Sequence, residues 1–355
     1  MAHVRVVQWT TGIVGASALR AILDDDRLEL VGVFAHGATK IGQDAGTLAG
    51  RPDTGVLATA DADALIALKP DCIVYMPHWP DVDLLERILR AGINVVTTAR
   101  LVTGAHYPDD AGARLQAAAL NGGVTLVGTG MNPMYVPTLA LASTAMCRDV
   151  QRIRVTESLD CVGYASAPMW EGYGFGGPPD TDRLHSILWK AEPDYLEALD
   201  SLAKGLGLEL DDYALVVDCA VSVDDRDLGF MQIAAGTVCG VDALWTGRAN
   251  GASEPGCRRH QIPIVEMRTV WTLGSIFGAP QQPEWKMLQG YQIDVKGDPN
   301  VRLKLSFRPD DYMNFDIGTT TAMPAVNAVT AVIAAPSGVL SPADLPIVTA
   351  RGRVR

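Results

Sequence analysis

The stretch Gln8-Trp9-Thr10-Thr11-Gly12-Ile13-Val14-Gly15 joins a short apolar segment to a segment with helical periodicity. Residues 4–9 predict a β-strand, and residues 14–24 predict a helix with one apolar face. A glycine-containing turn that follows a strand and opens a helix is typical of dinucleotide-binding sites. The alternative is a tight strand-to-helix turn that binds no ligand.

Two glycines in this stretch fit the second and third positions of the pattern G-x-G-x-x-G. Gly12 would let the backbone approach a pyrophosphate, and Gly15 would let helix and strand pack closely. The backbone N–H groups of residues 12–14 are expected to face the phosphates, where the helix dipole favours negative charge. Thr10 replaces the first glycine, and its hydroxyl and that of Thr11 are expected to add hydrogen bonds to the phosphate.

Strand-like and helix-like segments then alternate along the first third of the chain. Further strands are predicted at 28–34, 56–59, 72–76, 94–98 and 124–128, with helices at 62–68, 81–91 and 109–121. Short, continuously apolar strands are typical of strands that are buried on both faces. Alternating strands and helices imply right-handed crossovers, so the sequence predicts an α/β fold with a doubly wound parallel sheet. This context favours the ligand-binding interpretation of the first turn.

The end of the second strand bears on which dinucleotide binds. NAD sites place Asp or Glu there, about 20 residues after the glycines, on the ribose 2′-hydroxyl. Residues 34–40 contain no carboxylate but do contain His36 and Lys40, which could donate to a 2′-phosphate. This favours NADP, with NAD as a possible second cofactor; a solvated loop is the alternative. The predicted cofactor-binding residues are Thr10, Thr11, Gly12, Ile13, Val14, Gly15, His36, Lys40, Met76, Thr98 and Asn132.

The pattern changes after residue 133. A helix is predicted at 134–146, a strand at 151–162, a glycine-rich aromatic loop at 169–179 and helices within 181–206, followed by strands at 213–223, 229–243, 261–274, 289–297 and 300–307. Many strands with few crossover helices predict an α+β domain whose sheet is mostly antiparallel. A helix from 319 to about 334 is expected to return to the first domain. The predicted domains are therefore 1–133 and 134–318, with 319–355 as the returning segment.

The composition limits the classes of partner that the protein is expected to bind. The net charge of −12 is unfavourable for nucleic acids and anionic membranes, which require basic faces. The six cysteines form no Cys-x-x-Cys pair, so neither a zinc site nor any other metal site is predicted. No signal peptide and no apolar run of roughly 18 residues is found, so a cytoplasmic location is expected. The expected partners are a small-molecule substrate and a second copy of the chain.

Several motifs together resemble one family. They are VVQWTTGIVG, GVFAHGATKIGQDAG, LKPDCIVYM, NVVTT, GTGMNP and AVNAVTAVIAAPSGVLSPADLP. The chain resembles the dihydrodipicolinate-reductase-like oxidoreductases, which include 2,4-diaminopentanoate dehydrogenase and the native amine dehydrogenases. The resemblance implies a Rossmann domain, a dimerising α+β domain and NAD(P)-linked reduction of a C=N or C=O bond. It also implies an active site between the domains.

Two departures from that family affect the expected substrate. The chain has no adjacent pair of histidines, which the resemblance would require for dihydrodipicolinate. The amine dehydrogenases place a glutamate in the loop after the fifth strand, where it holds the cationic nitrogen. Here residues 97–108 contain neither Glu nor Asp, and Arg100 would repel an iminium if it pointed inward. Reductive amination with free ammonia is therefore not expected.

Polar side chains near the expected cleft are the catalytic candidates. His106 could transfer a proton near neutral pH, Tyr173 lies in the glycine-rich loop, and Asn132 follows the sixth strand. The alternatives are a solvent-facing histidine, aromatic packing and a helix cap. The predicted pocket residues are Arg100, Tyr135, Trp170, Phe175, Thr320 and Met323, a mostly apolar set that fits an apolar carbonyl or imine.

Two other interpretations remain open. A dinucleotide-binding sensor without chemistry would explain the missing glutamate. An amine dehydrogenase could instead use another acid, such as Glu157 or Asp160.

Overall fold

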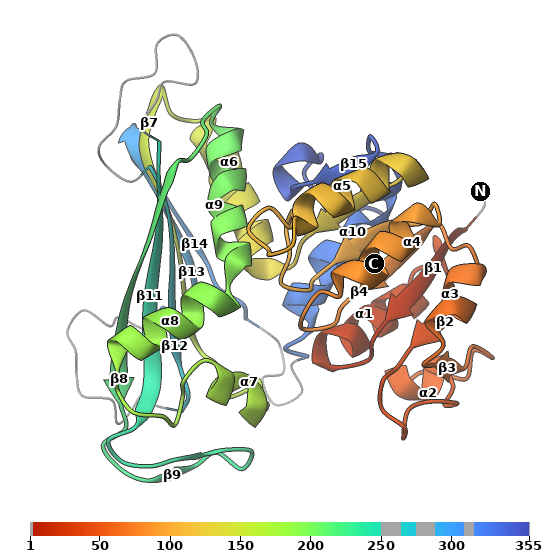
Figure 1. Ribbon diagram of the computed structural model, residues 1–355, viewed down its shortest axis with the longest axis horizontal. Helices are drawn as coiled ribbons and strands as arrows, with labels where there is room; N and C mark the ends of the chain where they lie inside the picture. The colour runs from red at the N-terminus through yellow and green to blue at the C-terminus, as the bar shows by residue number, and fades with distance from the viewer. Residues whose placement is uncertain (1–2, 250–263, 275–287, 309–315, 355) are drawn as a thin grey trace. The chain divides into compact units, whose positions relative to one another are not determined.

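The computed structural model describes residues 3–249, 264–274, 288–308 and 316–354. The chain forms two compact units, drawn in Figure 1. The first unit combines Met1–Tyr135 with Asp316–Arg355, and the second consists of Val136–Phe315. The first unit is thus built from both ends of the chain, with the second inserted between them.

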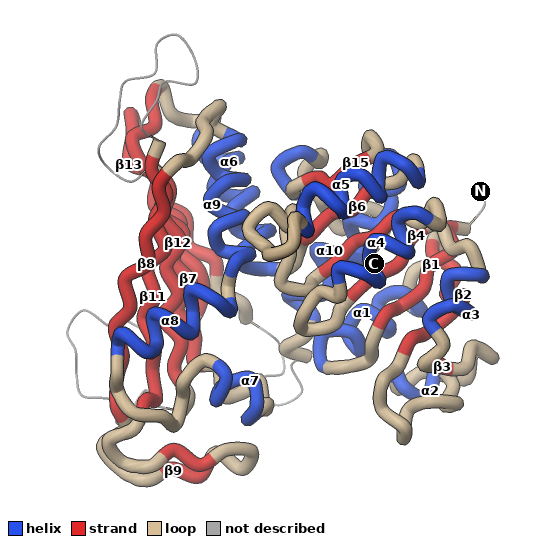
Figure 2. Tube along the Cα trace, in the orientation of Figure 1, coloured by secondary structure: helices blue, strands red, loops and turns tan. Residues whose placement is uncertain are grey.

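The first unit contains a seven-stranded parallel sheet with the order β15-β6-β5-β4-β1-β2-β3 (Figure 2). The strands are β1 (Val4–Trp9), β2 (Leu28–Phe34), β3 (Ala58–Thr59), β4 (Cys72–Tyr75), β5 (Asn94–Thr97), β6 (Thr125–Gly128) and β15 (Gly338–Leu340). The prediction of a doubly wound parallel sheet is confirmed. The seventh strand, β15, was not predicted, because three residues give too short a pattern to recognise.

Helices cover both faces of this sheet. They are α1 (Ile13–Leu23), α2 (Ala45–Ala49), α3 (Ala62–Ala67), α4 (Val82–Arg90), α5 (Ala111–Gly122) and α10 (Thr319–Ala334). One core contains Trp9 and Ile73 with Leu85 of α4 and Leu115 of α5. The other contains Val6 and Val74 with Ala18 of α1 and Val329 of α10. Alternate residues of β1 and β4 thus point to opposite cores, which explains why these strands are continuously apolar.

Aspartates fix where several of these helices begin. The carboxylate of Asp61 accepts a hydrogen bond of 2.9 Å from the N–H of Ala64, and that of Asp81 accepts one of 3.0 Å from Leu84. Such caps satisfy backbone donors that have no partner within the helix. The first turn of α1 is different, because its N-cap residue is Gly12 and no side chain caps it.

The second unit contains a six-stranded sheet with the order β14-β13-β7-β12-β11-β8. Its strands are β7 (Asp149–Asp160), β8 (Asp212–Val221), β11 (Val238–Arg248), β12 (Val265–Thr272), β13 (Gly290–Asp298) and β14 (Val301–Leu305). The pairing of β7 with β12 is parallel, and the other four pairings are antiparallel. The predicted α+β unit with a mostly antiparallel sheet is confirmed.

The helices of the second unit lie along one face of its sheet in Figure 1. They are α6 (Val136–Thr144), α7 (Ala167–Gly172), α8 (Thr181–Ala191) and α9 (Pro193–Gly205). Helix α6 begins two residues later than predicted, after an irregular turn at Met131–Tyr135. Helix α7 occupies part of the segment that was predicted to be a loop.

One predicted strand of the second unit is wrong. Residues 229–243 do not form a single strand but contain the short β10 (Gln232–Ile233), which pairs with β9 (Arg226–Asp227), and the start of β11. Gly229 and Gly236 have φ values of 81° and 79°, in the left-handed region that ends a strand. Residues 261–263 of the strand predicted at 261–274 lie outside the described residues.

Candidate functional site

The turn between β1 and α1 lies where the strand order of the parallel sheet reverses. On one side of β1 the order runs through β2 and β3, and on the other through β4, β5 and β6. Ligands of doubly wound sheets bind at this switch point, outside the carboxyl ends of the strands. The topology therefore places residues 10–15 at the most favourable position for a ligand in the first unit.

Gly12 leaves open space at this turn. No described atom lies within 4 Å of a Cβ added to Gly12, whose φ of −71° and ψ of −165° any residue can adopt. The backbone therefore does not require glycine here, but a close approach by a ligand would. Because no side chain caps α1, the N–H groups of its first turn can donate to an anion. Ile13 beside them is 43% exposed.

Gly15 is required by packing. A Cβ added there would lie 2.3 Å from the carbonyl oxygen of Thr10 and 3.2 Å from Nε2 of Gln8. The first distance is too short for any side chain, because the obstructing atom belongs to the backbone. The helix can approach the strand this closely only with glycine at position 15.

Thr10 adopts a left-handed backbone with a φ of 77°. This conformation costs a β-branched residue about 1–3 kcal/mol, which explains why glycine is common at this position of the pattern. The hydroxyl of Thr10 donates a 2.8 Å hydrogen bond to the carbonyl oxygen of Met76, just after β4. The expectation that this hydroxyl donates to a phosphate is therefore wrong, because Met76 already accepts its proton.

Gln8, the second-last residue of β1, supports this turn and was not predicted to belong to the site. Its side chain is completely buried, and its Nε2 donates to the carbonyl oxygens of Thr10 at 3.0 Å and Trp9 at 3.3 Å. A glutamine in an otherwise apolar strand, directly before a glycine-containing turn, was the available signal.

Two basic residues follow β2. Nζ of Lys40 donates a 2.6 Å hydrogen bond to the carbonyl oxygen of Thr11, so the lysine reaches back to the turn. His36 is exposed, and its ring meets the edge of Phe34 at 4.8 Å, while Phe34 stacks on Trp9 at 4.3 Å. Lys40 therefore contacts the predicted phosphate-binding turn, and His36 lies just after the end of β2.

The loops after β5 and β6 hold further predicted residues. Thr98 lies 3.8 Å, and Thr321 of α10 lies 3.5 Å, from a Cβ added to Gly130. Thr320, also predicted, is half-buried in the first turn of α10. Asn132 has an extended backbone and precedes the first residue of α6 by four positions, so its role as a helix cap stays a prediction.

Tyr135 ends the irregular turn after β6. Its hydroxyl donates to the carbonyl oxygen of Val348 at 3.2 Å. It therefore ties the turn to the C-terminal segment of the same unit.

Arg100 follows β5 and lies over an aromatic ring. Its guanidinium carbon is 5.8 Å from the centroid of the Trp79 ring, within the range of a cation–π interaction. Desolvation and the neighbouring Arg100 cation lower the pKa of His78 to about 4, so His78 is neutral at pH 7. His106, further along the same loop, is half-buried, whereas Leu101 is completely buried in the core.

The aromatic residues predicted for the pocket form a cluster in the second unit. Trp170, Tyr173 and Phe175 are each at most 4% exposed. The Trp170 ring contacts Phe175 at 5.3 Å, and Tyr173 contacts Trp271 of β12 at 5.6 Å. Nε1 of Trp170 donates to the carbonyl oxygen of Tyr164 at 2.7 Å. These contacts favour the alternative of aromatic packing for all three residues.

Two carboxylates in β7 were alternative acids. Glu157 is 8% exposed, and its Oε1 accepts a 3.2 Å hydrogen bond from the hydroxyl of Tyr291. Burial and the Glu157 charge raise the pKa of Tyr291. Asp160 instead accepts from the N–H groups of Val162 and Gly274, so it stabilises a turn.

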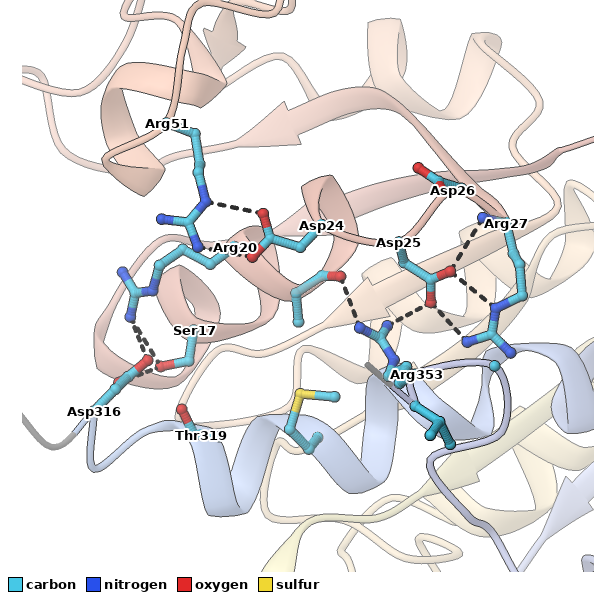
Figure 3. A pocket seen from close by; sticks show the side chains of 14 residues that line it. Ser17, Arg20, Asp24, Asp25, Asp26, Arg27, Arg51, Asp316, Thr319 and Arg353 are labelled. Atoms are coloured by element: carbon cyan, nitrogen blue, oxygen red, sulfur yellow. Dashed lines mark hydrogen bonds and ion pairs between the residues drawn. The ribbon is translucent and has the colours of Figure 1, made fainter. Parts of the chain in front are cut away.

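A charged cavity of about 600 Å³ lies in the first unit, and Figure 3 shows its lining. The four arginines pair with three of the aspartates: Arg51 with Asp24, Arg20 with Asp316, and Arg27 and Arg353 both with Asp25. Met323 of α10 lines this cavity and also packs against the apolar core that contains Val329, so its place in a substrate pocket stays a prediction. Four arginines and four aspartates line the cavity, so their formal charges cancel.

No group of His, Cys, Asp or Glu among the described residues is arranged to hold a metal ion. Within the same residues, no helix has the length and apolar character needed to cross a bilayer.

Comparisons with known proteins agree with this fold. A family model described as the 2,4-diaminopentanoate dehydrogenase C-terminal domain matches residues 134–353. An amine dehydrogenase from Streptomyces virginiae is 26% identical, with 99% of this chain and 98% of that protein covered.

Solved structures extend the likeness. The amine dehydrogenase from Mycobacterium smegmatis has a TM-score of 0.80 at 21% identity and covers 99% of this chain and 98% of its own. GenD2 from gentamicin A biosynthesis, solved in complex with NAD, has a TM-score of 0.52 at 17% identity. The match covers 97% of this chain and 90% of the GenD2 chain.

Proposed function

The chain belongs to the family of the 2,4-diaminopentanoate dehydrogenase C-terminal domain, and from this premise we propose that it is an NADP-dependent oxidoreductase. It would reduce the C=O or C=N bond of a small, largely apolar substrate. The proposal rests chiefly on the uncapped first turn of α1, with open space at Gly12, at the switch point of a parallel sheet. Titration of the protein with NADPH tests it directly.

The residues of the turn fit a dinucleotide. The N–H groups of residues 12–14 would hold the pyrophosphate, and Gly12 leaves the room that its oxygens need. Lys40, already bonded to the turn at Thr11, is placed to meet a 2′-phosphate, and no carboxylate in residues 34–40 would repel it. These features support NADP over NAD as the preferred cofactor.

The bound nicotinamide would supply the hydride, and the chain must then position the substrate and move a proton. His106 and Asn132 follow β5 and β6, at the edge of the sheet where ligands bind. We assign proton transfer to His106 and orientation of the substrate to the Asn132 amide. The burial of Tyr173 within the aromatic cluster gives it a structural role instead.

The loop after β5 bears on the nitrogen chemistry. Arg100 is a permanent cation in the loop where the amine dehydrogenases are expected to carry a glutamate, and it would repel an ammonium or iminium if it pointed toward the substrate. Breaking a buried ion pair costs several kcal/mol, and each 1.4 kcal/mol is about tenfold in rate. The protein should therefore reduce ketones, aldehydes or preformed cyclic imines far better than it combines a ketone with ammonia.

The test is NADPH oxidation on a panel of these substrates, each with and without ammonium. Arg100→Glu should raise any trace of ammonia-dependent activity. Leu101→Glu is the control, because Leu101 is completely buried and a charge there should destabilise the protein without raising activity. Strong ammonia-dependent activity of the unchanged protein would refute the preference.

A second candidate is an amine dehydrogenase that uses Glu157. The names of the relatives and the buried pair of Glu157 with Tyr291 support it. Glu157→Gln should then abolish ammonia-dependent turnover while NADPH binding stays unchanged. Absence of any turnover on the whole panel, with NADPH still bound, would instead favour a dinucleotide-binding sensor.

We also propose a homodimer that forms through the second unit. The sheet face opposite its helices carries a row of ion pairs, including Arg154 with Glu266 and Arg268 with Asp242, and Val216 on its edge strand is 63% exposed. Light scattering after gel filtration distinguishes a dimer from a monomer. Val216→Arg should shift a dimer toward the monomer.

A further inference from the structure

Gln8 is a fully buried polar side chain in the apolar strand β1. Its neighbours Val7 and Trp9 are 0% and 1% exposed. Its Oε1 accepts no hydrogen bond from the residues that the structure describes. A buried amide oxygen without a donor destabilises a fold, and a leucine or methionine would avoid that cost. What the glutamine contributes is therefore the pair of hydrogen bonds donated by its Nε2.

The stronger of these bonds holds the carbonyl oxygen of Thr10. That oxygen also lies close to the helix, because a Cβ added to Gly15 would be 2.3 Å from it. The Thr10 carbonyl thus accepts a hydrogen bond from the Gln8 amide at a place where the first turn of α1 leaves it no further room. Its position defines the peptide plane between Thr10 and Thr11.

The fixed peptide plane matters because Thr10 has a left-handed backbone. An unconstrained threonine would return to negative φ, and the next peptides would rotate with it. Rotation would turn the N–H groups of residues 12–14 away from their common direction. The side-chain bond to Met76 holds the hydroxyl of Thr10, and among the residues that the structure describes only the Gln8 bond holds its carbonyl oxygen.

We propose that Gln8 is a positioning residue of the dinucleotide site, which holds Thr10 left-handed and thereby aims the N–H groups of the turn. The inference rests on the proposed function, because it assumes that this turn binds the pyrophosphate. Gln8 and Thr10 together do what the first glycine of the common pattern does alone. Glycine adopts a positive φ without strain, so it needs no clamp.

The test is a cycle of three variants, with NADPH dissociation measured by calorimetry. Gln8→Met keeps the volume but removes the donor, and it should weaken NADPH binding about tenfold or more. Thr10→Gly should bind within about threefold of the unchanged protein. The double variant Gln8→Met/Thr10→Gly should bind like Thr10→Gly, because the glycine makes the clamp unnecessary.

Two controls separate positioning from general stability. Gln116→Met removes another glutamine contact to the backbone of the same unit, the 2.7 Å bond from the N–H of Val339, and should leave NADPH binding unchanged. Thr11→Gly, one residue further along at ordinary φ, should not rescue Gln8→Met. Full affinity in Gln8→Met, or no recovery in the double variant, would overturn the inference.

The cycle also distinguishes this inference from the proposed function. If the unchanged protein binds neither NADPH nor NADH, the proposed function fails. The same three variants are then compared by urea unfolding, where Thr10→Gly must still recover the stability lost in Gln8→Met. If Gln8→Met does not fold, the double variant carries the test, and its failure to fold or bind contradicts the inference.

Discussion

The hydroxyl of Thr10 and the carbonyl oxygen of Met76 form a 2.8 Å hydrogen bond that joins the ends of two neighbouring parallel strands. The bond crosses the switch point of the sheet, between β1 and β4. The sequence predicted that this hydroxyl would bind a phosphate, but the bond to Met76 gives it a role in stabilising the turn. The backbone N–H groups of the turn are then the groups that can contact a ligand.

Replacing Thr10 with valine should separate these roles. Valine keeps the shape of the side chain but removes the hydrogen-bond donor, so the free energy of unfolding should fall by about 1 kcal/mol. NADPH affinity should change less than about threefold, because the hydroxyl does not face the ligand. Urea unfolding and calorimetric titration measure the two effects. Thr330→Val, on the exposed side of α10, is the control and should change neither. A large loss of NADPH affinity in Thr10→Val would show that the hydroxyl contacts the phosphate.

The two glycines of the turn should respond in opposite ways. Gly12→Val should fold, because no described atom lies within 4 Å of the added Cβ, but it should abolish measurable NADPH binding by filling the space of the pyrophosphate. Gly15→Ala should instead lower the melting temperature strongly, because its Cβ meets the Thr10 carbonyl. Thermal unfolding with and without NADPH checks both. Unchanged NADPH affinity in Gly12→Val would show that the ligand lies elsewhere.

Lys40→Gln should reduce the preference for NADPH over NADH. Removal of the cation weakens the contact with a 2′-phosphate, and a loss of about tenfold in NADPH affinity with little change for NADH is expected. Lys69→Gln is a matched control, because Nζ of Lys69 also donates to a backbone carbonyl, that of Ala91 at 2.9 Å, after α4. His36→Asp should weaken NADPH selectively as well. Tighter binding of NADH than NADPH by the unchanged protein would contradict the cofactor assignment.

Asp25 should make stability depend on pH. Its hydrogen bond with Arg27 is the main cause that lowers its pKa below 3.8, and Arg353 contributes further. A lowered pKa in the folded state gives stability that is present above pH 3.8 and is lost as the pH falls through the folded value. Asp25→Asn should therefore lower the free energy of unfolding by about 2 kcal/mol at pH 7. The loss is moderate because the arginines remain partly exposed to water. The difference from the unchanged protein should shrink in urea unfolding below pH 3.8; a constant difference would exclude the ionic origin.

The sequence predicted well what depends on local pattern. The strands of the parallel sheet are short apolar runs, so β1 to β6 could be found, and the turn at Gly12 has the strand and the helix that the pattern requires on either side. The left-handed φ of Thr10 could not be found, because it depends on Gln8 beneath the turn and on Met76, which is 66 residues away.

Other features that the sequence did not predict have similar causes. Gly229 starts and Gly236 interrupts the segment that was predicted as one strand, and no periodicity shows that both take positive φ. The glycine-rich segment at 169–179 suggested a loop, but Trp170 packs on Phe175 and helps a short helix to form. Met323 was assigned to an apolar pocket from its type alone, and no local pattern shows the charged cavity that it lines, because the charged side chains come from segments as distant as Arg51 and Arg353.

The discontinuous first unit has a consequence for how the protein is made. Strand β15 and helix α10 come from the last forty residues, yet β15 completes the sheet beside β6 and α10 supplies six of the fifteen buried residues of one core. A ribosome releases β1 first, but the unit that begins with β1 cannot close until α10 and β15 have also been synthesised. The inserted second unit is fully synthesised before then, so the part of the chain that is made first is finished last.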